Sequence, residues 1–264
     1  MTASVIPSSS SVNLNEYLYA MATRGWFVFR NVLDQAFLAQ LRAEIDKSID
    51  HDKKSNKSLG NFFYLAHTRG PALAELLERS PLQAYVDAIL TDTCILHSYN
   101  AIDLRPHVGN KIQNTVHRDS PRYSRQYLLT IQILYMIDDF TKENGATHCL
   151  AGSHQVSDKP SDEFFSNNAV QVEGKAGDAL IFDSMVWHAG GENTTTKSRR
   201  GVTCVFTRSF MKQQIDLPRA TPVELVATLS ERSRRLLGFN VRVPASLDEF
   251  LLPADQRLYK ANQG

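Results

Sequence analysis

Residues 173–193 read EGKAGDALIFDSMVWHAGGEN, and this stretch holds the pattern that decides the fold class. A tight turn at Gly177 and Asp178 leads into a strand of alternating burial, which ends with His188 on a glycine-rich exit. Short β-branched and aromatic runs of the same kind recur after Thr93, with Gly and Asn turns between them. They are CILHSYNAIDL, KIQNTVH, YLLTIQILYMI, THCL, AVQVE, DALIFD and GVTCVFTRSF. Because no helix of useful length separates these runs, they predict an antiparallel sandwich or barrel.

Helices are expected before the β-rich part of the chain. A helix from about Asn15 to Thr23 should lead into a strand from Trp26 to Arg30, and Asp34 should cap a second helix. The second helix carries an apolar stripe at helical spacing, made by Phe37, Leu38, Leu41, Ile45 and Ile49. Another helix should open at Ser80 and Pro81, with an apolar face made by Leu82, Tyr85, Val86, Ile89 and Leu90.

A final helix is indicated by Thr221, Pro222 and Glu224, a capping-box arrangement with proline at the first helical position, and should end near Gly238. No internal repeat or interdomain linker is evident. We expect residues 1–12 to form a disordered tail and residues 13–264 to form one domain. Its parts would be a helical N-terminal part at 13–93, a β core at 94–211 and a helical tail at 212–264.

Composition excludes several classes of protein. The 29 Lys and Arg residues nearly balance the 28 Asp and Glu residues, so a nucleic-acid-binding or anionic-membrane-binding surface is not expected. Cys94, Cys149 and Cys204 are far apart and odd in number, which favours reduced core thiols. No run is apolar enough to span a membrane, the N-terminus lacks the features of a signal peptide, and the last four residues, ANQG, are not a peroxisomal address. A cytoplasmic location is therefore expected.

His117 and Asp119 form an H-x-D pair after an apolar run that resembles a strand. Side chains at i and i+2 of a strand point to the same side, so this pair can share one face of a metal ion. His188 on a distant, facing strand would complete the face. Two imidazoles and one carboxylate on one face leave three coordination positions open, which is the pattern of non-haem iron(II) oxygenases.

Arg199 lies eleven residues after His188, at the start of the run RRGVTCVFTRSF. A strand there, hairpin-paired with the His188 strand, would bring a guanidinium close to the metal. Its planar fork can hold a carboxylate with two hydrogen bonds. Arg200 should point to the other side, although a register slip of one residue would exchange the two arginines.

The ordered set H-R-D, NGATHCLAGSH, GDALIFDSMVWHAGGEN and SRRG resembles the phytanoyl-CoA dioxygenase family of iron(II)/2-oxoglutarate-dependent oxygenases. The opening RGWFVFRNVLDQAFLAQLRAEI and the late SRRLLGF are similar to the two ends of that family, so the resemblance covers nearly the whole chain. It implies a mainly β fold with flanking helices around a double-stranded β-helix, or jelly-roll, core.

The resemblance also implies roles for individual residues. His117, Asp119 and His188 match the iron ligands and form the catalytic centre, and Arg199 matches the arginine that pairs with the distal carboxylate of 2-oxoglutarate. Leu134 stands where the family often has tryptophan. Gln132 and Thr130, on the same face as Leu134, and Gln113, on the same face as His117, are further candidate co-substrate contacts.

The implied activity is a dioxygenase that uses Fe(II), 2-oxoglutarate and O2 to oxidise an unactivated C–H bond of a small molecule, with release of succinate and CO2. Hydroxylation is the expected outcome, although desaturation, cyclisation and epimerisation stay open, as do the substrate and the oligomeric state. The alternative is a metal-binding jelly roll without redox chemistry, such as a cupin-like isomerase or a binding module. A cupin has no need for Arg199 at its position.

Overall fold

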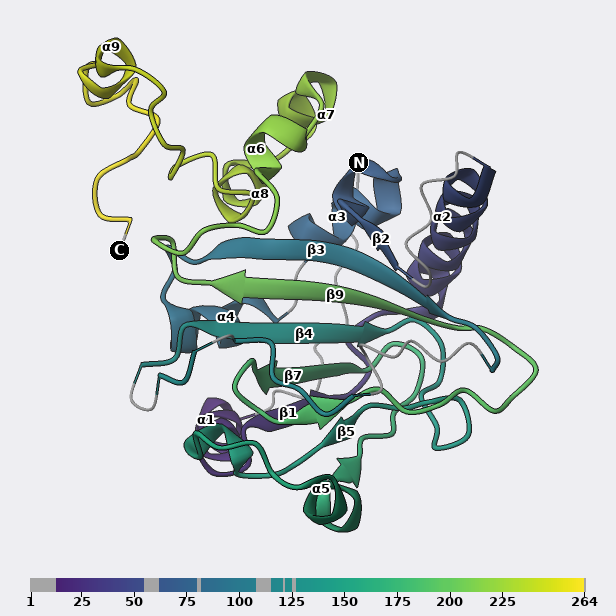
Figure 1. The fold of residues 1–264 in the computed structure, drawn as a ribbon. Helices are drawn as coiled ribbons and strands as arrows, with labels where there is room; N and C mark the ends of the chain where they lie inside the picture. The colour runs from purple at the N-terminus through teal and green to yellow at the C-terminus, as the bar shows by residue number, and fades with distance from the viewer. Residues whose placement is uncertain are drawn as a thin grey trace.

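The computed structural model describes residues 13–54, 62–79, 82–107, 115–120, 122–124 and 127–263. Two antiparallel sheets organise this part of the chain, a large one in the order β1-β7-β4-β9-β3-β2 and a small one in the order β6-β5-β8 (Figure 1). The strands are β1 (Trp26–Phe29), β2 (Phe62–Tyr64), β3 (Ile95–Leu104), β4 (Thr130–Met136), β5 (His148–Cys149), β6 (Val170–Gln171), β7 (Ala179–Asp183), β8 (His188–Ala189) and β9 (Arg199–Thr207).

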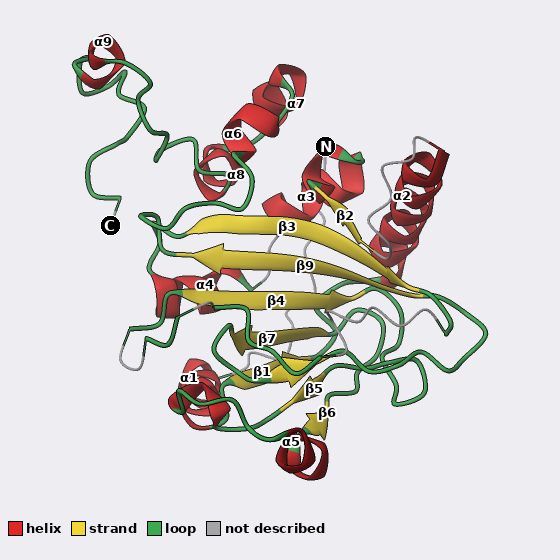
Figure 2. Cartoon of the chain, in the orientation of Figure 1, coloured by secondary structure: helices red, strands yellow, loops and turns green. Residues whose placement is uncertain are grey.

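Helices surround the sheets, so the architecture is mixed α/β with antiparallel sheets (Figure 2). The α-helices are α1 (Leu14–Thr23), α2 (Gln35–Lys54), α3 (Pro71–Arg79), α4 (Gln83–Leu90), α5 (Asp162–Asn168), α6 (Leu217–Ala220), α7 (Val223–Thr228), α8 (Glu231–Leu236) and α9 (Leu247–Phe250). Within the described residues, no helix combines the length and the apolar character that a membrane span requires.

Alternation along β4 separates the two faces of the large sheet. Ile131, Ile133 and Tyr135 join the main apolar cluster, to which α2, α3 and α4 contribute on the helical side. Leu134 and Met136 point the opposite way, into a second cluster shared with the small sheet. This follows from the two-residue period of a strand, and it leaves the second face free to carry a site.

The apolar stripe of α2 is confirmed as the centre of the helical layer. Leu38, Leu41 and Ile45 have no exposed surface, and burial of each such side chain contributes about 1.5–3 kcal/mol. The predicted cap is also present, because the Asp34 carboxylate accepts a hydrogen bond from the backbone N–H of Phe37 at 2.8 Å. Sequence periodicity was therefore sufficient for this element.

Other predictions need correction. The pattern did not reveal α3 or α5, and the expected last helix is two helices, α7 and α8, interrupted at Leu229 and Ser230. Thr221 does not cap α7: its hydroxyl donates to the carbonyl of Leu217 within α6, and Pro222 takes the N-cap position. The tail at 1–12 and the Ser80–Pro81 helix start lie outside the described residues.

The partner of β9 also differs from the expectation. β9 pairs with β3 and β4 in the large sheet, whereas β8, which carries His188, belongs to the small sheet. The predicted hairpin between these strands is therefore wrong, because the loop at 190–198 crosses from one sheet to the other. In addition, β1 and β2 join the large sheet from the N-terminal part of the chain, so this sheet extends beyond the expected β core.

Candidate active site

The segment at 117–120 is anchored to the small sheet and to the end of β7. The backbone N–H of His117 donates to the carbonyl of His188 at 2.9 Å, and the reverse hydrogen bond is 2.8 Å. Three residues further on, the N–H of Ser120 donates to the carbonyl of Ser184 at 3.1 Å. Asp119 is thus held between two fixed points, although its segment is not a regular strand.

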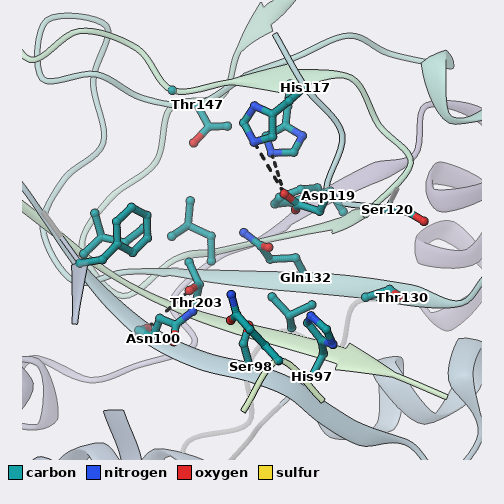
Figure 3. A pocket seen from close by; sticks show the side chains of 18 of the residues that line it. His97, Ser98, Asn100, His117, Asp119, Ser120, Thr130, Gln132, Thr147 and Thr203 are labelled. Atoms are coloured by element: carbon teal, nitrogen blue, oxygen red, sulfur yellow. Dashed lines mark hydrogen bonds and ion pairs between the residues drawn. The ribbon is translucent and has the colours of Figure 1, made fainter. Parts of the chain in front are cut away.

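The side chains of His117, Asp119 and His188 converge, and Figure 3 shows the two imidazoles directed towards the carboxylate of Asp119. Their potential ligand atoms all lie within 4.8 Å of one another. One oxygen of Asp119, Oδ1, lies 3.6 Å from Nε2 of His117 and 3.7 Å from Nε2 of His188. These separations are too long for hydrogen bonds and suit atoms that meet at a common ion.

The tautomers of both histidines favour metal binding. Nδ1 of His117 lies 2.7 Å from the carbonyl oxygen of Thr115, and Nδ1 of His188 lies 2.9 Å from that of Val186. Because a carbonyl oxygen can only accept, each Nδ1 carries the hydrogen and each Nε2 presents its lone pair to Asp119. Burial lowers the pKa of His188, so this imidazole stays neutral, as a metal ligand must.

Arg199 is a buried cation on the same cavity wall as the sheet residues. Its Nε and Nη1 atoms have no hydrogen-bond partner within the described part of the chain. Its guanidinium carbon lies 3.8 Å from the ring centroid of Phe140, and burial lowers the pKa of Arg199 to about 9. An arginine held in this way can bind a carboxylate through two parallel N–H···O hydrogen bonds from its planar guanidinium.

The side chain of Arg200 points to the face of β9 opposite to that of Arg199, as expected from the two-residue period of a strand. It donates to Asp46 at 2.7 and 3.0 Å and to Asp138 at 2.9 Å. With both carboxylates already engaged, Arg200 has its partners outside the cavity. The register of β9 therefore assigns the free guanidinium to Arg199 alone of the two.

A cavity of about 900 Å³ lies between the large sheet and the three converging side chains. This volume falls in the upper part of the range of about 300–1,000 Å³ for ligand sites. Gln132, Thr130 and Leu134 of β4 line it, and Figure 3 places Gln132 across the cavity from His117. Gln113 lies outside the described residues.

Several other polar side chains differ in whether they face the cavity. Tyr64 and Asn100 line the cavity, whereas Tyr99 points into the helical core and donates from its hydroxyl to Leu73. His67 is buried against Thr221 and is not among the described residues that line the cavity. Arg118 lies over the ring of Trp187 and donates to the carbonyl of Ser157, so it is already engaged.

Phe140 and Thr147 were missed by the sequence reasoning. Phe140 supports the guanidinium of Arg199, and Thr147 faces the cavity from beside the small sheet (Figure 3). Neither belongs to a motif with ligand spacing, because their roles arise from contacts across the two sheets. No local signal could have found them.

Comparison with known proteins agrees with this geometry. Residues 21–201 match the family model described as phytanoyl-CoA dioxygenase. The chain is 35% identical over 266 residues to the uncharacterized protein Rv1501 of Mycobacterium tuberculosis, with 97% of both chains covered. It is 30% identical over 125 residues to the iron/alpha-ketoglutarate-dependent dioxygenase ausO of Aspergillus calidoustus, covering 46% of this chain and 42% of that protein.

A solved structure resembles the fold. EctD from S. alaskensis with bound Fe matches with a TM-score of 0.65 at 16% identity, covering 80% of this chain and 83% of EctD. At this identity the match concerns the fold. The family match over most of the chain carries the assignment: the chain belongs to the phytanoyl-CoA dioxygenase family of iron(II)/2-oxoglutarate-dependent oxygenases.

Proposed function

We propose that the protein hydroxylates an unactivated C–H bond of a small-molecule metabolite, releasing succinate and CO2, in natural-product or other secondary metabolism. One observation carries the proposal: a His-Asp-His set and a buried, unpaired arginine open onto one cavity. The antiparallel sheets that face each other across this cavity support a double-stranded β-helix core within a single oxygenase domain.

His117, Asp119 and His188 would hold iron(II) through two Nε2 atoms and a carboxylate oxygen. The donor set fits, since both histidines are fixed in the tautomer that presents Nε2. Iron(II) with 2-oxoglutarate and O2 supplies the oxidising power when bound. The protein fixes the ligands, positions the co-substrate and excludes water from the cavity.

Arg199 would hold the distal carboxylate of 2-oxoglutarate. Its unpaired guanidinium requires an anion, because an uncompensated buried charge is costly. A cupin-like isomerase or a metal-binding module, the alternative from another class, has no use for such a group. Arg199 therefore favours the oxygenase.

Gln132 and Thr130 both line the cavity from β4. Gln132 lies across the cavity from the three converging side chains (Figure 3). Along β9, Gln132 pairs with Val205 and Thr130 with Thr207, so Gln132 lies nearer to the Arg199 end of the sheet. Both stay proposed co-substrate contacts. Gln113 stays a sequence-based proposal.

The test compares His117→Ala and Asp119→Ala with the unchanged protein. Addition of iron(II) and 2-oxoglutarate without oxygen should give a weak visible charge-transfer band, and both variants should lose it. Substrate-dependent succinate release should disappear in both, while the circular dichroism spectrum is retained. Full succinate formation in either variant, or no band in the unchanged protein, would end the proposal.

A further inference from the structure

The charges that face the cavity are few. Among its described lining residues, Asp119 and Arg199 are the only acidic and basic side chains besides the histidines. His117 and His188 each have Nδ1 beside a carbonyl oxygen, which leaves Nε2 to face Asp119. His97, at the opposite end from Arg199, has its Nδ1 atom 3.0 Å from the carbonyl oxygen of Lys212.

These charges cancel once the proposed metal and co-substrate are bound. Iron(II) and Arg199 bring three positive charges, and Asp119 with the two carboxylates of 2-oxoglutarate brings three negative ones. No lysine or arginine of the described lining is then left for a further anion. An anionic substrate group would lose its hydration without gaining such a partner, which is strongly unfavourable.

The end of the cavity beyond the metal is uncharged but not wholly apolar. Ser98 on β3 and Gln132 on β4 flank Val205 of β9 in one row across the sheet. Ser98 is buried and lines the cavity. Gln132 is a proposed co-substrate contact, so the Ser98 hydroxyl is the group of this row that would face a substrate, and a buried hydroxyl favours a hydrogen-bonding partner there.

Apolar side chains make up much of the remaining lining. Phe62, Leu134, Phe182, Val205 and Met211 face the cavity, and Gln214 lies at its exposed rim. Such walls bury an apolar ligand body, while a few polar groups fix its orientation. The lining therefore matches a ligand that is mostly apolar and carries a few hydrogen-bonding groups.

We propose that the substrate is a neutral, mostly apolar molecule with a few hydroxyl, carbonyl or amide groups, and that carboxylates, phosphates and acyl-CoA thioesters are excluded. The inference rests on the proposed function, because the charge balance includes iron(II) and 2-oxoglutarate. The discrimination between neutral and anionic substrates is assigned to the absence of a lysine or arginine at the substrate end of the described cavity lining.

The test uses binding rather than turnover. The enzyme is loaded without oxygen with iron(II) and 2-oxoglutarate, and retention of matched probes is measured by equilibrium dialysis with mass spectrometry. The pairs are terpenoid and polyketide acids with their methyl esters, phosphate monoesters with their alcohols, and an acyl-CoA with its N-acetylcysteamine thioester. Neutral members should be retained at least about tenfold better than their charged partners, corresponding to about 1.4 kcal/mol.

A gain-of-charge variant makes the test specific to this site. Gln214→Lys places a cation at the exposed rim, where the fold should not change, and should reduce the preference for neutral probes to threefold or less. Gln256→Lys, at an exposed position away from the cavity lining, is the matched control and should keep the original preference.

The outcomes separate the two proposals. If the visible band with iron(II) and 2-oxoglutarate does not form, the proposed function fails. If the band forms but charged members bind as well as or better than neutral ones, or no neutral member is retained, the inference on the substrate is overturned. An unchanged preference in Gln214→Lys also overturns it, because the lining charge would then not control selection.

Discussion

His117 and His188 are joined by two backbone hydrogen bonds, of 2.9 and 2.8 Å, and their ring centroids lie 4.3 Å apart. This pairing links residues that are 71 positions apart in the chain. It fixes the spacing of the two imidazoles before any ion binds, because the backbone rather than the metal holds them together. The Oδ1 atom of Asp119 already lies 3.6 and 3.7 Å from the two Nε2 atoms, which completes the set.

Asp119→Ala should weaken metal binding without unfolding the protein. The side chain is partly exposed, and its nearest histidine nitrogens lie 3.6 and 3.7 Å away, so little folding energy depends on it. Iron(II) affinity, measured by anaerobic titration, should fall by more than the roughly 10–100-fold that loss of a hydrogen-bond partner of a ligand costs. The melting temperature of the metal-free protein should stay within about 2 °C of the original. Unchanged affinity would contradict the assignment of Asp119 as a ligand.

Arg199→Met should increase the stability of the folded protein while it weakens 2-oxoglutarate binding. The buried guanidinium lacks partners for two of its nitrogens, so an apolar side chain of similar length should raise the free energy of unfolding by roughly 1–3 kcal/mol. Loss of the guanidinium group should raise the KM for 2-oxoglutarate at least about 30-fold, equivalent to about 2 kcal/mol. Urea titration and initial-rate kinetics check the two effects.

Arg200→Met is the matched control for this prediction. It removes hydrogen bonds to Asp46 and Asp138 but no group that lines the cavity. The KM for 2-oxoglutarate should change less than about threefold, and stability should fall rather than rise. Equal kinetic effects in both variants would show that Arg199 acts through the structure of β9 and not through the co-substrate.

The buried imidazole of His67 should make the free energy of unfolding decrease at acidic pH. Burial lowers the pKa of His67 to about 4 from an unfolded value near 6.5. Since the unfolded chain takes up the proton first, the stability from this group is present above pH 6.5 and is lost as the pH falls towards 4. The difference corresponds to roughly 3 kcal/mol at 1.36 kcal/mol per pH unit.

His67→Gln removes this titration and should flatten the dependence of unfolding free energy on pH between 7 and 4. Urea unfolding at several pH values measures the slope. His51→Gln is the control, because His51 is largely exposed. It should leave the slope unchanged. An equally steep slope in the His67 variant would contradict the prediction.

Alanine substitutions at Gly177 and Gly152 allow the steric cost of an added Cβ to be compared in two turns. Both have a positive φ, +98° and +75°, so alanine should cost about 1–2 kcal/mol at either position. At Gly177 an added Cβ would also lie 2.5 Å from the carbonyl oxygen of Leu33, whereas at Gly152 the nearest atom is 3.5 Å away. Gly177→Ala should therefore destabilise the protein by more than Gly152→Ala in urea unfolding. Equal losses would mean that the turn before β7 can move away from Leu33.

Local sequence patterns were sufficient where one element determines its own structure. The stripe of α2 predicted which of its residues are buried, and strand alternation predicted that Thr130, Gln132 and Leu134 share one face, because helical and strand periods act over a few neighbouring residues. The same alternation separated Arg199 from Arg200, since adjacent strand residues point to opposite faces. The H-x-D pair and His188 could be proposed as ligands because metal binding restricts both residue type and spacing.

Only the tertiary structure decided which sheet each strand joins and which groups meet across the cavity. The sequence predicted a hairpin between the His188 and Arg199 strands, but the loop between them crosses from one sheet to the other. Phe140 reaches Arg199, and Ser98 joins the row of Gln132, through contacts between segments far apart in the chain. Periodicity reports which way a side chain points; pairing between distant strands, which depends on the packing of the whole core, determines what it meets.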